Sequence, residues 1–127
     1  MTHILIVDDS PTELHVVKNM LEKHGFQIST ADTGEQGIVQ ALRDQPDLIL
    51  MDVVMPGMNG FQATRKLTRN TTTAQIPVIV ITTKDQETDK IWAMRQGASD
   101  YVVKPVVEQS LVAKINAQLD GAGAAAT

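Results

Sequence analysis

Short, continuously apolar stretches alternate along the chain with longer segments in which apolar residues recur at helical spacing. The apolar stretches are residues 4–7, about 26–31, 48–51, 78–81 and 101–103. Those at 4–7, 48–51 and 78–81 contain only Ile, Leu, Val and Met, as strands buried on both faces do. The stretch at 26–31 mixes apolar and polar residues, which favours a strand at the edge of a sheet.

Helix signals occupy the segments between these stretches. Ser10-Pro11-Thr12-Glu13 has the form of a capping box, with Ser10 as N-cap and proline at the first helical position. This helix is expected to end near Lys23-His24-Gly25. The other predicted helices run from Thr33 to a point before Pro46, from Asn59-Gly60 to roughly Arg69, from a cap at Asp85 to Gly97, and from Val107 to Leu119.

On the fourth predicted helix, Ile91, Met94 and Ala98 are expected to form the buried stripe. Trp92, the only tryptophan, lies beside that stripe and is expected to be half exposed. Both core packing and contact with a partner protein fit this position, since aromatic residues are enriched at interfaces. After Leu119, the small residues 121–127 predict a flexible C-terminal tail.

Alternation of strands and helices predicts an α/β fold of the (βα)5 type, a parallel sheet with helices on both faces. Right-handed crossovers restrict the strand order, and a flavodoxin-like order of 2-1-3-4-5 satisfies them. The length of 127 residues suits one domain, which we place at residues 1–120. In this order the first and third strands are neighbours at the switch point where such sheets bind ligands.

Polar residues follow four of the apolar stretches directly. Asp8-Asp9 follow 4–7, Asp52 follows 48–51, Thr82 follows 78–81 and Lys104 follows 101–103. If the strands are parallel, these side chains gather at the carboxyl edge of the sheet. Clustered carboxylates repel one another, so the cluster indicates a metal ion, a reacting phosphoryl group, or both.

The chemistry of these residue types suits phosphoryl transfer. A carboxylate such as Asp52 can attack phosphorus and form an acyl phosphate, provided that nearby cations offset the repulsion. Mg²⁺ prefers carboxylates, water and phosphate oxygens, and Lys104 and Thr82 would contribute an ammonium and a hydroxyl donor. Each residue alone has an ordinary explanation, such as a turn or a solvated charge, but their shared position favours a site.

Bulk properties narrow the function classes. The formal net charge is −4, without a long basic run, so nucleic acid is not an expected partner. There is no cysteine, and the three histidines show no zinc spacing. The first residues do not resemble a signal peptide, and no apolar stretch is long enough to cross a bilayer. We therefore expect a cytoplasmic protein without membrane insertion, and a monomer by default.

Several motifs taken together resemble the response-regulator receiver domain of the CheY-like type. They are Val7-Asp8-Asp9-Ser10, residues 52–60 (Asp-Val-Val-Met-Pro-Gly-Met-Asn-Gly), Ile81-Thr82 and residues 97–105, which end in Lys104-Pro105. The resemblance covers residues 3 to about 119. It implies the same 2-1-3-4-5 strand order, which is the known order of this family and so is not an independent result.

The resemblance implies a role for each matching position. Asp52 is expected to be the phosphoacceptor, and Thr82 and Lys104 to contact the phosphoryl group. Tyr101 matches the switch aromatic, and the Lys104-Pro105 peptide bond is expected to be cis. The expected Mg²⁺ ligands are Asp8, Asp9, Asp52 and the backbone carbonyl of Val54.

The residues at positions 54 and 83 modify what the resemblance implies. Val54 cannot orient an attacking water by hydrogen bonding, so the phosphoryl group is expected to be lost slowly. Thr83 stands where receivers commonly carry alanine and is expected to restrict the inward position of Tyr101.

The resemblance also implies partners. A sensor histidine kinase of the CheA type would supply the phosphoryl group, and the face built from helix 4, strand 5 and helix 5 would bind a downstream target. Residues 7–13, 60–65 and 82–90 further resemble stand-alone receivers of the chemotaxis-like system that controls type IV pili and twitching motility. In that setting the chain either switches a target or acts as a phosphate sink, without turning over a substrate.

Two functions of other classes remain open at this point. A phosphatase of the haloacid dehalogenase type also uses an aspartate nucleophile with Mg²⁺, but it needs a second Asp two residues later, where this chain has Val54. A docking module that never carries phosphate would leave the carboxylate cluster without a purpose, and loss of Asp52 would then have no effect.

Overall fold

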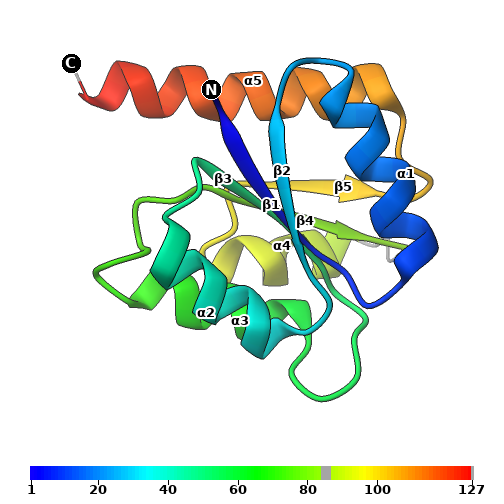
Figure 1. Ribbon diagram of the computed structural model, residues 1–127. Helices are drawn as coiled ribbons and strands as arrows, with labels where there is room; N and C mark the ends of the chain where they lie inside the picture. The colour runs from blue at the N-terminus through cyan, green and yellow to red at the C-terminus, as the bar shows by residue number, and fades with distance from the viewer. Residues whose placement is uncertain (84–86, 127) are drawn as a thin grey trace.

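The computed structural model describes residues 1–83 and 87–126, with side chains described as far as Gly121. Strands and helices alternate along this part of the chain (Figure 1). The strands are β1 (His3–Val7), β2 (Gln27–Ala31), β3 (Leu48–Asp52), β4 (Val78–Thr82) and β5 (Asp100–Val103). The helices are α1 (Pro11–Glu22), α2 (Gly34–Asp44), α3 (Gly60–Arg69), α4 (Glu87–Arg95) and α5 (Glu108–Ala126).

The five strands form one parallel sheet in the order β2-β1-β3-β4-β5. This confirms the predicted fold class and strand order. β2 lies at an edge, as its mixed sequence predicted, while β1, β3 and β4 have neighbours on both sides. β1 and β3 are paired from Ile4 with Leu48 to Val7 with Met51, which brings their carboxyl ends to the same level.

Helices cover both faces of the sheet, α1 and α5 on one and α2, α3 and α4 on the other (Figure 1). Successive strand residues point to opposite faces. In β1, Ile4 and Ile6 therefore pack toward α1 and α5, whereas Leu5 and Val7 pack toward the other three helices. The apolar stretches are buried from both sides, which is why they lack alternating polar residues.

The predicted helix starts are confirmed for the helices whose caps are described. The side chain of Ser10 accepts a hydrogen bond from the Glu13 N–H at 3.3 Å, and Thr33 caps α2 in the same way. The complete capping box is found at α3, where Asn59 and Gln62 bond reciprocally. The expected cap of α4, Asp85, lies outside the described residues.

The predicted buried stripe of α4 is wrong at two positions. Ile91 and Met94 are 46% and 49% exposed, and the helix instead buries Ala93 completely. Ala98, just beyond the helix, is buried as expected, and Trp92 is 48% exposed. The helix rests on the sheet through a small residue, so its large apolar side chains remain at the surface.

The backbone of α5 continues to Ala126, beyond the helix end predicted at Leu119. Alanine has the highest helix propensity, so the run from Ala124 to Ala126 favours extension despite the nearby glycines. A flexible tail was expected at residues 121–127, but the side chains beyond Gly121 lie outside the described part of the chain. The domain boundary at residue 120 stays a prediction. None of the helices in the described residues is long and apolar enough to cross a membrane.

Candidate functional site

Main-chain hydrogen bonds align the strand ends that carry the predicted site residues. The Asp8 N–H donates to the Ala31 carbonyl at 3.0 Å, which extends the β1–β2 ladder by one residue. The Lys104 N–H donates to the Thr82 carbonyl at 2.7 Å and so holds the first residue after β5 beside the end of β4. Because these bonds involve the backbone, the positions of Asp8 and Lys104 follow from the sheet itself.

The start of α3 packs against the backbone of Asp52, the last residue of β3. The N–H of Gly60, the first residue of α3, donates to the Val53 carbonyl at 2.9 Å. A Cβ at position 60 would lie 2.1 Å from the Asp52 carbonyl oxygen, far inside van der Waals contact. Glycine is therefore required here so that the start of α3 can press against the backbone of the expected phosphoacceptor.

Lys104 lies among the carboxylates at this edge. Its Nζ is 3.0 Å from Asp52 Oδ1 and 3.5 Å from Asp8 Oδ2, and it donates a hydrogen bond to Glu13. The side chains of Lys104, Asp8 and Asp52 are only 15%, 9% and 8% exposed, whereas that of Glu13 is 45% exposed. The structure thus brings Asp8, Asp52 and Lys104 together, as predicted, and adds a carboxylate from α1.

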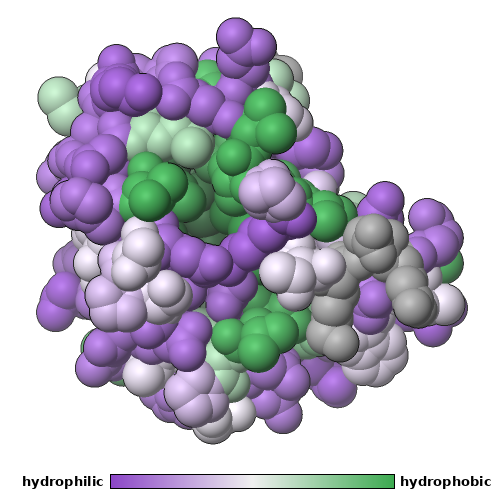
Figure 2. Space-filling model, turned by 90° about the vertical axis from the view of Figure 1, so that its right-hand side faces the viewer, coloured by the Kyte–Doolittle hydropathy of each residue, from purple (hydrophilic) through white to green (hydrophobic). Residues whose placement is uncertain are grey.

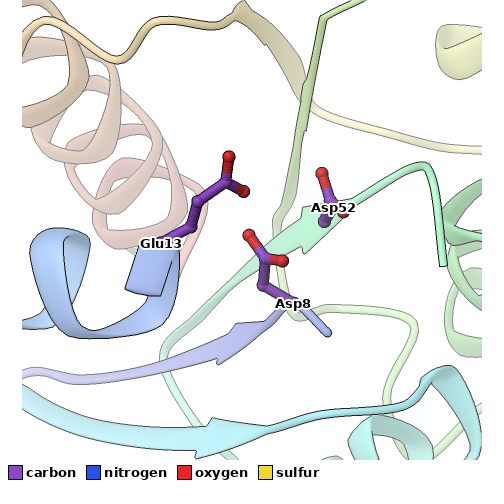
Figure 3. Close-up of side chains that lie close together, drawn as sticks. All are labelled: Asp8, Glu13 and Asp52. Atoms are coloured by element: carbon purple, nitrogen blue, oxygen red, sulfur yellow. The ribbon is translucent and has the colours of Figure 1, made fainter. Parts of the chain in front are cut away.

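Sequence reasoning assigned Glu13 to the helix cap and missed its place in the site. Figure 3 shows its carboxylate projecting from α1 toward the same space as those of Asp8 and Asp52. The available signal was its position in the first turn of the helix that follows Asp8-Asp9, because that turn must lie at the same edge of the sheet. An acidic side chain there can either cap the helix or reach the cluster.

Crowding and burial shift the pKa values of these groups. Burial raises the pKa of Asp8 to about 6, and the negative charge of Asp52 adds to that effect. Burial likewise raises the pKa of Asp52, against the opposing influence of Lys104. Burial alone would lower the pKa of Lys104, but its hydrogen bonds to Glu13 and Asp52 raise it overall, so the lysine stays charged. The hydrogen bond from Lys104 lowers the pKa of Glu13.

The donor set fits a hard divalent cation. Carboxylate oxygens of Asp8, Glu13 and Asp52 all lie within 4.8 Å of one another, and Lys104 is the only cation paired with them among the described residues. Oxygen ligands with an excess of negative charge are what Mg²⁺ and Ca²⁺ prefer. Asp9 is exposed and lies outside this compact group, although its charge contributes to the raised pKa of Asp52.

The remaining predicted residues surround this cluster. Thr82 is buried at the end of β4, one residue beyond Ile81, which is paired with Asp52 across the sheet. The side chain of Val54 is 60% exposed. The Lys104-Pro105 peptide bond is cis, as expected. Tyr101 is buried while Thr83 is exposed. The expected restriction of Tyr101 by Thr83 stays a prediction.

A partly open cavity of about 250 Å³ adjoins the cluster between α1 and the connection from β5 to α5. Its apolar wall includes Val16, Met20 and Val106, and Glu13 and Lys104 line it on the polar side. Figure 2, which views the molecule from the side of α1, shows an apolar hollow above a band of hydrophilic surface. The charged cluster is therefore open to a partner or a small molecule from this side.

Comparison with known proteins identifies the family to which this arrangement belongs. The sequence model of the protein family named response regulator receiver domain matches residues 4–116. The chain belongs to the response regulator receiver family. It is 59% identical over 121 residues to protein PilH of Pseudomonas aeruginosa, an alignment that covers 95% of this chain and 100% of PilH. It is 41% identical to the response regulator PleD of Caulobacter vibrioides, of which it spans only 25%.

Solved receiver structures share this fold. A CheY-like receiver domain protein from Methanospirillum hungatei superposes with a TM-score of 0.90 at 28% identity, covering 97% of each chain. The receiver domain of a sensor histidine kinase from Pseudomonas aeruginosa superposes with a TM-score of 0.87, also at 28% identity, covering 94% of this chain and 98% of that one. That structure holds a magnesium ion in its active site cleft.

Proposed function

We propose that this receiver accepts a phosphoryl group from a histidine kinase on Asp52. The observation that supports it most directly is the buried Asp52 carboxylate at the end of β3, 3.0 Å from the ammonium of Lys104. A carboxylate in this position is a nucleophile, and the lysine stabilises the negative charge of an incoming phosphoryl group. Thr82, at the end of the adjacent strand, would donate its hydroxyl to a phosphoryl oxygen.

Mg²⁺ is the cation we assign to the site, held by Asp8, Asp9, Asp52 and the backbone carbonyl of Val54. The excess of carboxylates over cations supports this assignment, as does the magnesium ion in the similar kinase receiver. When bound, Mg²⁺ would neutralise charge on the phosphoryl oxygens. The protein itself would position Asp52 and keep Lys104 charged.

Phosphorylation is tested by incubating the protein with MgCl₂ and acetyl phosphate and measuring the intact mass. We expect one phosphoryl group on the wild type and none on Asp52→Asn, because the amide is not a nucleophile toward phosphorus. Asp120→Asn, an exposed position on α5, serves as a matched control and should be labelled normally. An unlabelled wild type, or equal labelling of Asp52→Asn, would overturn the assignment.

The face formed by α4, β5 and α5 is the proposed output surface. Ile91, Trp92 and Met94 expose large apolar side chains on α4, and Tyr101 of β5 is buried in the same core cluster as Ala93 of that helix. An exposed apolar group of this kind suits a protein partner. Phosphorylation would shift a pre-existing equilibrium of this face through Thr82 and Tyr101.

The physiological role proposed here is control of type IV pili and twitching motility from the cytoplasm, without substrate turnover. It is supported by the sequence motifs and by the extensive identity to PilH. Two modes are possible, a switch that binds a target and a sink that drains phosphate from a CheA-type kinase. The exposed apolar side chains of α4 favour the switch.

Complementation of a Pseudomonas aeruginosa strain that lacks PilH separates these modes. A switch requires both Asp52 and the α4 face, so Asp52→Asn and Trp92→Ala should each abolish rescue of twitching. A sink requires only Asp52, so rescue by Trp92→Ala would contradict the switch. Phosphorylation of Trp92→Ala in vitro should equal that of the wild type, which controls for damage to the site.

A further inference from the structure

Glu13 is available to the site because the helix cap does not use its carboxylate. In a complete capping box this carboxylate would accept a hydrogen bond from the Ser10 N–H. That N–H instead donates to Asp8 Oδ1 at 2.9 Å. The Glu13 side chain is therefore free to turn into the cluster, where it accepts a hydrogen bond from Lys104 (Figure 3).

The same lysine is the group that a phosphoryl group on Asp52 would need. Lys104 contacts Asp52 and Asp8 as well as Glu13, and no other cation of the described residues is paired with these carboxylates. Phosphorylation replaces the single negative charge of the Asp52 carboxylate by roughly one and a half to two negative charges on the phosphoryl oxygens, which compete for ammonium donors. Glu13 would then lose its hydrogen bond to Lys104, and its negative charge would repel the nearby phosphoryl group.

Exposure indicates which partner gives way. The Lys104 side chain is 15% exposed and the Glu13 side chain 45%, so the glutamate has more open solvent beside it than the lysine has. Glu13 also lines the cavity between α1 and the β5–α5 connection, which Figure 2 shows as an open hollow. Its carboxylate can leave Lys104 for this solvent-accessible space without moving a strand or a helix.

We propose that Glu13 is an internal competitor of the phosphoryl group. It pairs with Lys104 in the unphosphorylated protein and must release it when Asp52 is modified, so it lowers phosphoryl occupancy. This inference rests on the proposed phosphorylation of Asp52. Glu13 thereby acts through Lys104 as a positioning residue that sets how strong a phosphodonor must be to fill the site.

The test measures binding of BeF₃⁻, a noncovalent mimic of the phosphoryl group, at saturating Mg²⁺. Glu13→Gln keeps the length of the side chain but removes its charge, and Glu22→Gln removes one charge from the far end of the same helix. We expect Glu13→Gln to bind BeF₃⁻ about fivefold more tightly than wild type, which corresponds to an ion pair at the strong end of the range for partly exposed pairs. Glu22→Gln should bind it as the wild type does. Equal or weaker binding by Glu13→Gln would overturn the proposal.

A separate Mg²⁺ titration without BeF₃⁻ distinguishes competition for Lys104 from a role as metal ligand. As a competitor that does not serve the ion, Glu13 can be replaced by Gln with less than about a tenfold loss of Mg²⁺ affinity, whereas even an outer-shell partner of a bound metal typically costs about 10–100-fold. A larger loss would overturn the proposal in favour of a metal ligand. Thermal unfolding of each variant confirms that the fold is kept.

Failure of the phosphorylation assignment would look different. If wild type binds no BeF₃⁻ and acetyl phosphate leaves no label, the proposed function fails, and with it the role of Glu13. If wild type binds BeF₃⁻ through Asp52 but Glu13→Gln behaves identically, only the competition is refuted. Asp52→Asn, which should bind no BeF₃⁻, is therefore included in each series.

Discussion

Asp8 illustrates how its surroundings alter a single carboxylate. It is only 6% exposed, and burial together with the charge of Asp52 raises its pKa to about 6. A pKa raised by folding means that folding favours the protonated form. The ionised form is therefore a source of instability above that pH, and its retention at this position is explained by function rather than by stability.

Replacing Asp8 by Asn should consequently stabilise the metal-free protein at neutral pH. The amide keeps an oxygen for the Ser10 N–H but removes the charge, and we expect a gain of about 1–2 kcal/mol in the free energy of unfolding. The gain should shrink as the pH falls through about 6, where wild-type Asp8 becomes protonated. Urea unfolding of both proteins across this pH range is the measurement; a variant no more stable than wild type at neutral pH would contradict it.

Two buried threonines near α3 offer an opposed pair of substitutions. Thr64 is fully buried, and its hydroxyl has no hydrogen-bond partner in the described part of the chain. Thr73 is equally buried, but its hydroxyl donates to the Leu67 carbonyl at 2.6 Å. Thr64→Val should therefore stabilise the protein by about 1 kcal/mol, and Thr73→Val should destabilise it by a similar amount. Equilibrium unfolding measures both, and the same sign for the two substitutions would show that the hydroxyl contacts do not decide the outcome.

Among the helices, α3 is the one whose position bears directly on the phosphoacceptor. Its first residue, Gly60, packs against the backbone of Asp52 and Val53 so closely that any side chain would collide. The Asn59–Gln62 capping box fixes the same helix end. The local sequence thus determines where α3 begins, and α3 in turn supports the backbone that carries the nucleophile.

Gly60→Ala should reduce both stability and phosphorylation, because either α3 or the end of β3 must shift. We expect a loss of about 2–3 kcal/mol, typical of overpacking against the backbone, and slower labelling of Asp52 by acetyl phosphate. Gly121→Ala is the matched control: nothing lies within 4 Å of its added methyl group, so helix propensity should leave α5 unchanged or slightly more stable. Thermal unfolding and intact mass report the two effects. Wild-type stability and labelling in Gly60→Ala would refute the close contact.

For the molecule as a whole, the parallel sheet is what makes a site from dispersed residues. Asp8, Asp52, Thr82 and Lys104 come from four different strand ends, and the ladder bonds bring those ends together. Folding therefore concentrates like charges that the unfolded chain keeps apart. A cation that binds the folded site should offset this cost.

Mg²⁺ should accordingly raise the thermal stability of wild type relative to EDTA. A ligand at ten times its dissociation constant stabilises the folded state by about 1.4 kcal/mol when it does not bind the unfolded chain. The increment should be smaller in Asp52→Asn and unchanged in Asp120→Asn, which alters a charge away from the site. Scanning calorimetry at several Mg²⁺ concentrations measures it, and an equal increment in all three proteins would place the bound ion elsewhere.

The sequence by itself determined the element order, the parallel sheet and the identity of Asp8, Asp52, Thr82 and Lys104 as residues of one edge. Apolar stretches, caps and strand-end polar residues are local signals, and the right-handed crossover turns them into a topology. Only the tertiary structure decided that Glu13 pairs with Lys104 and that Ile91 and Met94 face outward. Both outcomes depend on how a helix is rotated and seated against distant strands. A local sequence pattern does not determine the rotation and position of a helix, because both depend on the side chains of the strands and helices that pack against it.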